Sequence, residues 1–420
     1  MAGELTLNVQ TNKATFPTTE GQQVAYVLIE ARATEAIAHM KMPLNFGLIL
    51  DHSGSMEGAK LQNMKAAATL AIQQMGPQDL VSVVIFDDKV KVLVPRQPVS
   101  SPSALSALIE KITAAGGTKI SLGLRAGLDE LGKGLEGQRV NRLLLLTDGE
   151  TFGDEAKCIA LAEEAGRQQI AITALGLGND WNAELLDQIA RASGGSSDFI
   201  PEGKPDVILQ TFEQQVLAAQ ATVVHNAQLV LRLAAQVLPR AVWRAAPLIQ
   251  KLDHRVLSDR DVQVALGDLN CDQNQSVLVE LLLPPRQPGT YRVAQAEVIY
   301  DVPALHLSGE RERSDVLLSF TSDLAQSQQS NPYVLNIVER VTAHKLQTKA
   351  LEEAAVGNIV AATQKLRAAA TRLLELGEDE LAHTAETEAQ RLERGEGMSA
   401  AGAKKLRYET RKLTQKLDDL

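Results

Sequence analysis

Four continuous apolar runs of strand length, separated by segments with helical periodicity, constrain the fold of this chain more than any other feature. The runs are LNFGLIL, LVSVVIF, NRLLLLT and IAITALGLG, and they fall between residues 44 and 178. Runs without polar alternation are typical of strands buried on both faces of a parallel sheet. The first segment between them has apolar residues three or four positions apart, which indicates a helix: Leu61, Met64, Ala68, Ala71 and Met75. This alternation predicts a doubly wound α/β domain over residues 44–219.

The segments on either side of this domain contain strand-like runs without intervening helices. Residues 1–43 hold two such runs, and residues 220–321 hold four more: TVVHNAQLVLRL, SVLVELLL, TYRVAQAEVIYDV and RSDVLLSF. Two short strands cannot bury a sheet face alone. We therefore expect both segments to form one β-sandwich, with the α/β domain inserted between its two parts.

The rest of the chain has a polar and then a helical character. Residues 322–331, SDLAQSQQSN, read as a linker, and the pair Asn331-Pro332 is a typical helix start. Residues 332–420 are predicted to be a helical domain. Six basic residues between positions 404 and 416 are expected to pair with the acidic stretch before them in a helical hairpin, the alternative being contact with an acidic partner or nucleic acid.

Oxygen-bearing side chains follow the ends of two predicted strands of the α/β domain. Asp51, Ser53 and Ser55 come directly after the first strand, and Asp148 ends a later one. Between them, Gly116-Gly117-Thr118 opens a helix. Ligands of open α/β sheets bind outside the carboxyl ends of the strands, where these segments meet. Hydroxyl and carboxylate oxygens without a His-Cys set suit Mg²⁺, with Mn²⁺ or Ca²⁺ as alternatives.

These segments resemble a von Willebrand factor A domain with its metal-ion-dependent adhesion site. FGLILDHSGSM, GGTKISLGL and LLLLTDGE occur in the order typical of that family, within residues 44–216. The resemblance implies that Ser53, Ser55 and Thr118 supply hydroxyl ligands. It also implies that Asp51 and Asp148 act partly through water. The chain resembles bacterial cytoplasmic proteins that contain such a domain.

The ligand set predicts recognition of a partner rather than a reaction. Neutral hydroxyls leave the charge of a bound ion incompletely neutralised, so the ion favours one further anionic oxygen. A partner's Asp or Glu carboxylate would supply it. We therefore expect a cation-dependent protein-binding module and no enzymatic activity.

Each site residue also has a structural alternative. Asp51, Ser53 and Ser55 could belong to a turn that caps the next helix, and Thr118 could be the N-cap of the helix that starts near residue 120. Asp148 could be a turn residue before a glycine. Three further groups near the motif are interpreted separately: His52 is expected to be exposed, Glu150 is equally compatible with contacting the site or starting a loop, and the pair Asp87-Asp88 is expected to be turn residues.

Two further functions remain as alternatives. One is an adaptor or regulatory subunit of a separate ATPase. The other is a metal-dependent hydrolase, which is disfavoured because the chain has no GxSxG or phosphate-binding loop motif. The formal net charge of −10 argues against a nucleic-acid partner. No apolar stretch is long enough to span a membrane and no signal peptide is evident, so the cytoplasm is the expected compartment.

Overall fold

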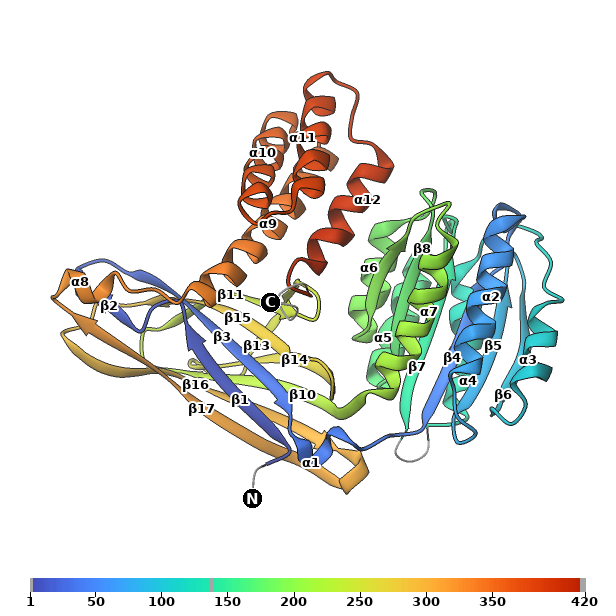
Figure 1. Cartoon of the computed structure of the whole chain (residues 1–420), viewed down its shortest axis with the longest axis horizontal. Coiled ribbons are helices and arrows are strands. Elements are labelled where there is room, and N and C mark those ends of the chain that lie inside the picture. Colours follow the sequence, from blue (N-terminus) through green and yellow to red (C-terminus); the bar gives the residue numbers. More distant parts are fainter. Residues whose placement is uncertain (1–2, 136–138, 416–420) are drawn as a thin grey trace. The chain divides into compact units, whose positions relative to one another are not determined.

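The structure, a computed structural model, describes residues 3–135 and 139–415 and divides into two compact units (Figure 1). One unit spans Lys41–Thr222 and contains the α/β domain. The other joins the chain up to residue 40 with the chain from residue 223 onward. The predicted insertion of an α/β domain into a β-sandwich is thereby confirmed. The last residues of the predicted helical region, 416–420, lie outside the described residues, and Lys416 with them.

The inserted unit is built on a six-stranded sheet with the order β6-β5-β4-β7-β8-β9. Its strands are parallel except for β6, which runs antiparallel to β5. The four predicted runs form β4, β5, β7 and β8, whereas both edge strands were missed because they are short or partly exposed. The strands are β4 (Leu44–Asp51), β5 (Leu80–Phe86), β6 (Val90–Pro98), β7 (Val140–Thr147), β8 (Ala171–Leu177) and β9 (Ser196–Ile200).

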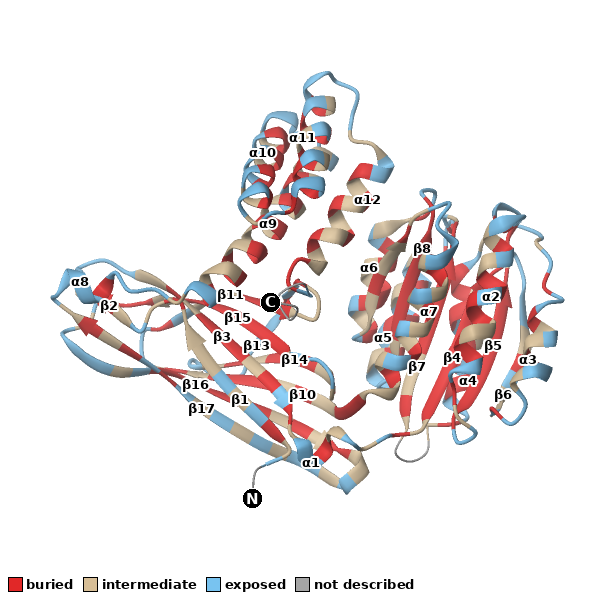
Figure 2. Cartoon of the chain, viewed as in Figure 1, coloured by how far each residue is buried: buried red, intermediate tan, exposed pale blue. Residues whose placement is uncertain are grey.

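Helices cover both faces of this sheet, so its central strands are buried along their length (Figure 2). The chain moves from β4 to β5 on one side and then to β7 on the other, which makes the carboxyl end of β4 the switch point of the sheet. Register places Asp51 beside the end of β7. The helices are η1 (Gly54–Met56), α2 (Ala59–Gln73), α3 (Pro102–Ile109), α4 (Ile120–Gly132), α5 (Glu155–Arg167), α6 (Ala183–Ser193) and α7 (Pro205–Gln220).

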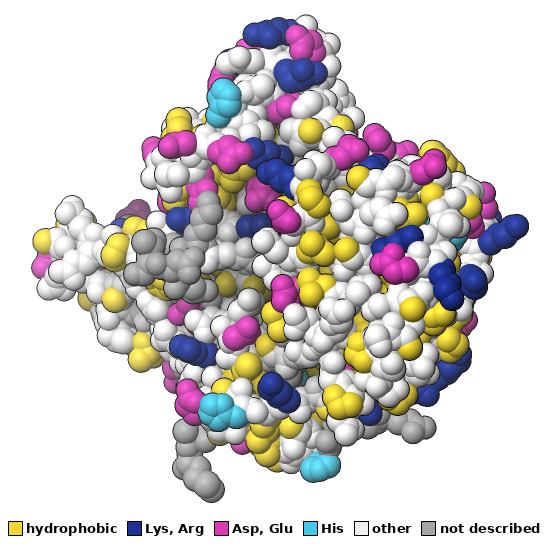
Figure 3. Space-filling view, turned by 45° about the vertical axis from the view of Figure 1, so that its right-hand side comes forward, with side chains coloured by type: hydrophobic (Ala, Val, Ile, Leu, Met, Phe, Trp, Pro, Cys, Tyr) yellow, Lys and Arg dark blue, Asp and Glu magenta, His cyan; other side chains and the backbone are white. Residues whose placement is uncertain are grey.

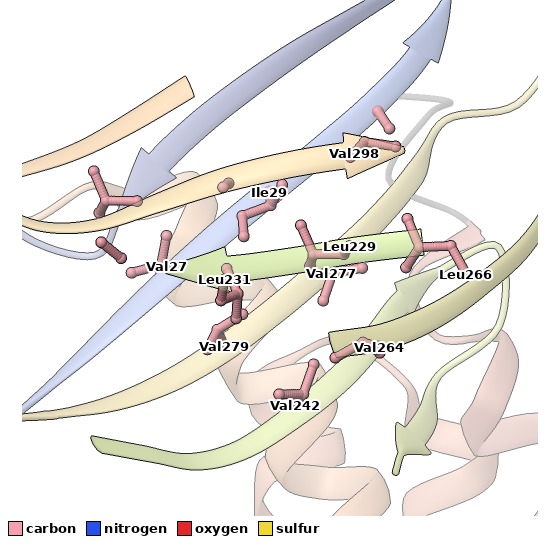
Figure 4. Close-up of a cluster of buried hydrophobic side chains, with 14 of the residues drawn as sticks. Val27, Ile29, Leu229, Leu231, Val242, Val264, Leu266, Val277, Val279 and Val298 are labelled. Atoms are coloured by element: carbon pink, nitrogen blue, oxygen red, sulfur yellow. The ribbon is translucent and has the colours of Figure 1, made fainter. Parts of the chain in front are cut away.

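The β-sandwich consists of a five-stranded sheet, β1-β3-β15-β11-β12, and a six-stranded sheet, β13-β14-β10-β16-β17-β2. Val27 and Ile29 of one sheet face Leu229 and Leu231 of the other across an aliphatic core (Figure 4). The strands are β1 (Leu5–Thr11), β2 (Thr15–Pro17), β3 (Gln23–Ala33), β10 (Thr222–Leu233), β11 (Leu238–Ala246), β12 (Gln250–Leu252), β13 (His254–Val256), β14 (Asp261–Asn270), β15 (Gln275–Leu283), β16 (Gly289–Val302) and β17 (Leu307–Thr321). Helix α1 (Glu35–Ala38) and η2 (Pro303–Leu305) complete the connections.

The C-terminal helices pack on the outer face of the five-stranded sheet. Leu28 and Leu278 of that face share a buried cluster with Val334 and Ile337 of the first long helix. The sheet is therefore buried on both faces, which explains why β15 is apolar from Val277 to Leu283 except for Glu280, whose carboxylate pairs with Lys345. The helices are α8 (Leu324–Ser327), α9 (Pro332–Ala355), α10 (Ile359–Glu375), α11 (Asp379–Glu393), α12 (Ala400–Glu409) and η3 (Thr410–Lys412).

Two predictions about the C-terminal region have distinct outcomes. The predicted linker 322–331 contains a helix, α8, which packs against β2 and β17, so the sandwich and the helices are not separated by a free tether. In the basic segment, Lys405 pairs with Glu380 of α11, as expected for pairing with the acidic stretch, whereas Lys412 forms a local pair with Glu409 within the segment itself. No helix among the described residues combines the length and apolarity needed to cross a bilayer.

Candidate metal centre

Asp51 is the buried anchor of the site. It ends β4 with none of its surface exposed, and both of its carboxylate oxygens accept hydrogen bonds. Oδ1 accepts from the backbone N–H of Ser53 at 2.8 Å, and Oδ2 accepts from the hydroxyl of Thr147 at 2.6 Å. Burial raises the pKa of Asp51 to about 6, although these two hydrogen bonds oppose the shift. A nearby cation would favour the charged form of this carboxylate.

The two serines connect Asp51's loop to Asp148 at the end of β7. The hydroxyls of Ser53 and Ser55 are 3.1 Å apart, and Ser55 donates to Oδ1 of Asp148 at 2.6 Å. The other oxygen of Asp148 accepts from the ammonium of Lys60 at 2.7 Å. Two hydroxyls and two carboxylates from β4, η1 and β7 are thus brought together at one edge of the sheet.

The loop that carries Thr118 is held against the serine loop by backbone contacts. Gly54 donates its N–H to the carbonyl of Gly116 at 3.0 Å, and the N–H of Gly117 donates to Oδ2 of Asp88 at 2.8 Å. Gly116 has a φ of +66°, a left-handed conformation that favours glycine. The loop before Thr118 therefore depends on this glycine for its path.

Thr118 meets the other donors around Gly149. A Cβ added to this glycine would lie 2.9 Å from the hydroxyl oxygen of Thr118 and 3.8 Å from that of Ser55. The absent side chain leaves a small space that is bordered by hydroxyl oxygens from two different loops. A residue other than glycine would fill it.

The structure contradicts the capping alternatives for the hydroxyl residues. Ser53 precedes η1 without a side-chain cap bond, and α2 begins after Gly58. Helix α4 begins after Lys119, also without a side-chain cap, so Thr118 is not its N-cap. The first N–H groups of α4 instead donate to Thr151 and Asp154 of the loop after β7. Long-range contacts therefore replace the local cap.

The remaining predictions near the motif also have definite outcomes. His52 was expected to be exposed, but its side chain is only 13% exposed, and Nδ1 lies 2.9 Å from the carbonyl oxygen of Thr113. Glu150 is exposed and lies in a loop. Asp87 accepts from the N–H of Lys89 at 2.6 Å, as a turn residue does. Asp148 is buried with two side-chain partners, so it is more than a turn residue.

Sequence reasoning missed two residues of the site. Thr147 lies within the quoted run LLLLTDGE but was not given a role, and it donates directly to Asp51. Lys60 is the second residue of α2 and pairs with Asp148. Its position five residues after Ser55, at the start of a helix that follows the strand end, is the sequence signal that could have indicated this contact.

The donor set fits a hard divalent cation. Asp51 and Asp148 are both buried, and Lys60 forms an ion pair with Asp148, so two carboxylate charges face one ammonium charge at this edge of the sheet. Its donors are all oxygens. Among the described residues, no group of three or more His, Cys, Asp or Glu side chains could hold a metal. A cation at this edge would therefore depend on the hydroxyls of Ser53, Ser55 and Thr118 as well as on the two carboxylates.

Comparisons with known proteins agree with this architecture. Residues 46–213 match the model of the von Willebrand factor type A domain, and residues 332–416 match that of the Sll0103-like, C-terminal alpha-helical domain. The chain is 33% identical to protein sll0103 of Synechocystis sp., over 96% of this chain and 95% of that protein.

Two solved structures share the fold over nearly the whole chain. One is a von Willebrand factor type A protein from Catenulispora acidiphila, with a TM-score of 0.77, 18% identity and coverage of 97% of this chain and 96% of that one. The other is the ArnB paralog VWA2 from Sulfolobus acidocaldarius, with a TM-score of 0.55, 12% identity and coverage of 98% and 99%. The similarity thus extends beyond the inserted domain to the sandwich and the helices.

Proposed function

Because this chain belongs to the family of protein sll0103 and contains a von Willebrand factor type A domain, we propose that it binds a partner protein through a divalent cation held at Asp51, Ser53, Ser55, Thr118 and Asp148. The von Willebrand domain points to protein interaction in general. The dependence on a cation and on an acidic partner residue is our proposal. We expect Mg²⁺, with Mn²⁺ or Ca²⁺ as alternatives.

The proposed role of each residue follows from its contacts. Ser53, Ser55 and Thr118 present neutral hydroxyl oxygens as direct ligands. Asp51 orients the serine loop through its bond to the N–H of Ser53 and is itself held by Thr147. Asp148 orients the hydroxyl of Ser55, and Lys60 balances part of its charge. When bound, the cation supplies an electrophilic centre that favours one more anionic oxygen.

The observation that carries the proposal is that both buried carboxylates are already engaged by groups of this chain. Each oxygen of Asp51 and of Asp148 accepts at least one hydrogen bond. They are thus suited to orienting the hydroxyl ligands rather than saturating a cation with negative charge. A carboxylate from outside can then complete the coordination.

The surface charge favours a protein partner over a polyanion, and the contacts of the nearby basic residues favour binding over hydrolysis. Acidic and basic side chains are interspersed on the face shown in Figure 3, which suits a protein partner better than a polyanion. His52 is tied to Thr113, and Lys60 is tied to Asp148, so neither of these bases is poised to activate a water. An adaptor role beside an ATPase would use the same binding surface.

Affinity capture tests the proposal directly. The immobilised full chain is incubated with a native extract in Mg²⁺ and, separately, in EDTA. The Asp51→Ala variant is tested in Mg²⁺, and Ser103→Ala, at an exposed position of α3, serves as the control variant. A partner that is retained by the wild type and the control, and is lost in EDTA and with Asp51→Ala, is the expected result. Equal capture in EDTA would show that the interface does not use a cation.

A further inference from the structure

A phenyl ring projects into solvent from the loop that begins at the candidate metal centre. Phe152 is 79% exposed, and it follows Asp148 by four positions in the connection between β7 and α5. Removing an aromatic side chain from water is favourable because its apolar surface is buried. A phenylalanine left outside is therefore available for burial against something else.

The exposure of Phe152 does not come from a loosely held loop. Thr151 before it and Asp154 after it are each 2% exposed, and their side chains are hydrogen-bonded to each other. Asp154 also accepts the N–H of Ser121 at 2.9 Å. The loop is fastened on both sides of the ring, so the ring is presented on a rigid support. Rigid aromatic side chains are frequent anchors of protein interfaces because little conformational entropy is lost when they bind.

The same contacts hold the residue before Phe152 against the loop that carries Thr118. The hydroxyl oxygen of Thr151 lies 3.3 Å from the carbonyl oxygen of Thr118. Phe152 therefore directly follows the residue, Thr151, that contacts the loop carrying Thr118. Four residues of chain span at most about 14 Å, so the ring and Asp148 lie within the reach of one short peptide.

We propose that Phe152 is the apolar half of the binding surface and that the partner segment carries an Asp or Glu with an aliphatic or aromatic residue within about four positions of it. This inference rests on the proposed cation-dependent binding. The carboxylate approaches the cation held by the hydroxyls, and the neighbouring apolar side chain packs on the phenyl ring. The partner is therefore an acidic segment with an adjacent apolar residue, rather than an acidic tract alone.

Selection from peptide pools distinguishes the two parts of this surface. The probes are two random nine-residue pools, one with a fixed central Asp and one with a fixed central Asn, each selected on the full chain in Mg²⁺ and in EDTA. The receptors are the wild type, Phe152→Ala and the control Val256→Ala, which removes an apolar side chain of similar exposure (65%) in the other unit. Mn²⁺ affinity and thermal unfolding are measured for each receptor.

The expected result is that Asp-centred peptides are enriched in Mg²⁺ only and carry an apolar residue at a preferred flanking position. With Phe152→Ala, this flanking preference disappears and the affinity of selected peptides falls about tenfold, the equivalent of about 1.4 kcal/mol. Mn²⁺ affinity stays unchanged, as does binding to the control. Asp enrichment without a flanking preference, or with one that Phe152→Ala leaves intact, overturns the inference and leaves cation-dependent binding standing. Absence of any Mg²⁺-dependent Asp enrichment overturns both.

Discussion

The ammonium of Lys60 lies 2.7 Å from Oδ2 of Asp148, while Oδ1 of the same carboxylate accepts the hydroxyl proton of Ser55. Asp148 is buried, and the side chain of Lys60 is 20% exposed. Burial lowers the pKa of Lys60, but its hydrogen bond to Asp148 and the charge of that carboxylate outweigh burial and raise it. The lysine therefore stays charged and offsets the negative charge of Asp148, the carboxylate that accepts the hydroxyl of Ser55.

Replacing Lys60 should tighten cation binding in the absence of a partner. Lys60→Met removes a positive charge beside the site, and we expect the affinity for Mn²⁺ to rise roughly fivefold, the equivalent of about 1 kcal/mol. Electron paramagnetic resonance of free Mn²⁺ measures this directly, and Lys60→Arg is the charge-preserving control. Weaker binding by Lys60→Met in a folded protein would show that the lysine shapes the site and does not compete with the cation.

The cation should stabilise the folded chain through the predicted ligands. Because a ligand that binds only the native state raises stability by mass action, Mg²⁺ at one hundred times its dissociation constant should add about 2.7 kcal/mol. We expect the double variant Ser53→Ala and Asp148→Ala to lose this increment while Ser103→Ala retains it. Differential scanning calorimetry with and without Mg²⁺ provides the measurement. A Mg²⁺-dependent shift that persists in the double variant would place the cation elsewhere.

The sandwich should lose stability in acid through one buried carboxylate. Glu297 of β16 is fully buried, forms an ion pair with Arg232 and accepts a hydrogen bond from Arg313. Burial raises the pKa of Glu297, but these arginines outweigh burial and hold it below its usual value of 4.5. A depressed pKa contributes stability that is present above the unfolded value and is lost as pH falls through the folded value.

The comparison of Glu297→Gln with the wild type tests this linkage. The variant should be less stable at pH 7, and the difference should shrink as the pH falls below 4.5, the usual pKa of the carboxyl group. Urea unfolding across pH 3 to 7 measures it, with the half-buried Glu310 of β17 changed to Gln as the control. A difference that stays constant over this range would mean that the arginines do not favour the charged form.

The helices and the five-stranded sheet should unfold as one cooperative unit. Leu28 has none of its surface exposed and packs in the cluster that joins this sheet to α9. Leu28→Ala should cost about 2–5 kcal/mol. Hydrogen exchange should then be faster in Leu28→Ala than in the wild type, in both the sandwich and the helices. Faster exchange confined to β3 would indicate that the helices form a separately stable domain.

Local pattern was sufficient for the four central strands of the inserted domain and for five residues of its candidate site. The runs that became β4 and β7 are mostly apolar without alternation because both faces of a parallel sheet are covered, so they can be predicted as strands without knowing their neighbours. Asp51 and Asp148 directly end such strands, and strands of one parallel sheet bring their carboxyl ends to the same edge. The position of the site therefore follows from the order of short segments along the chain.

Tertiary contacts decided what local pattern could not. The helix cap was an alternative role for Thr118, but Thr151 and Asp154 from another loop satisfy the start of α4 instead. His52 was expected to be exposed, and its partner lies 61 positions away in the chain. No role was predicted for Lys60 or Phe152, because the partner of Lys60 lies 88 positions away and the exposure of Phe152 depends on the fold around it. Pairing and burial of these side chains depend on which distant segments the fold brings to them, and a sequence pattern records only the spacing within one segment.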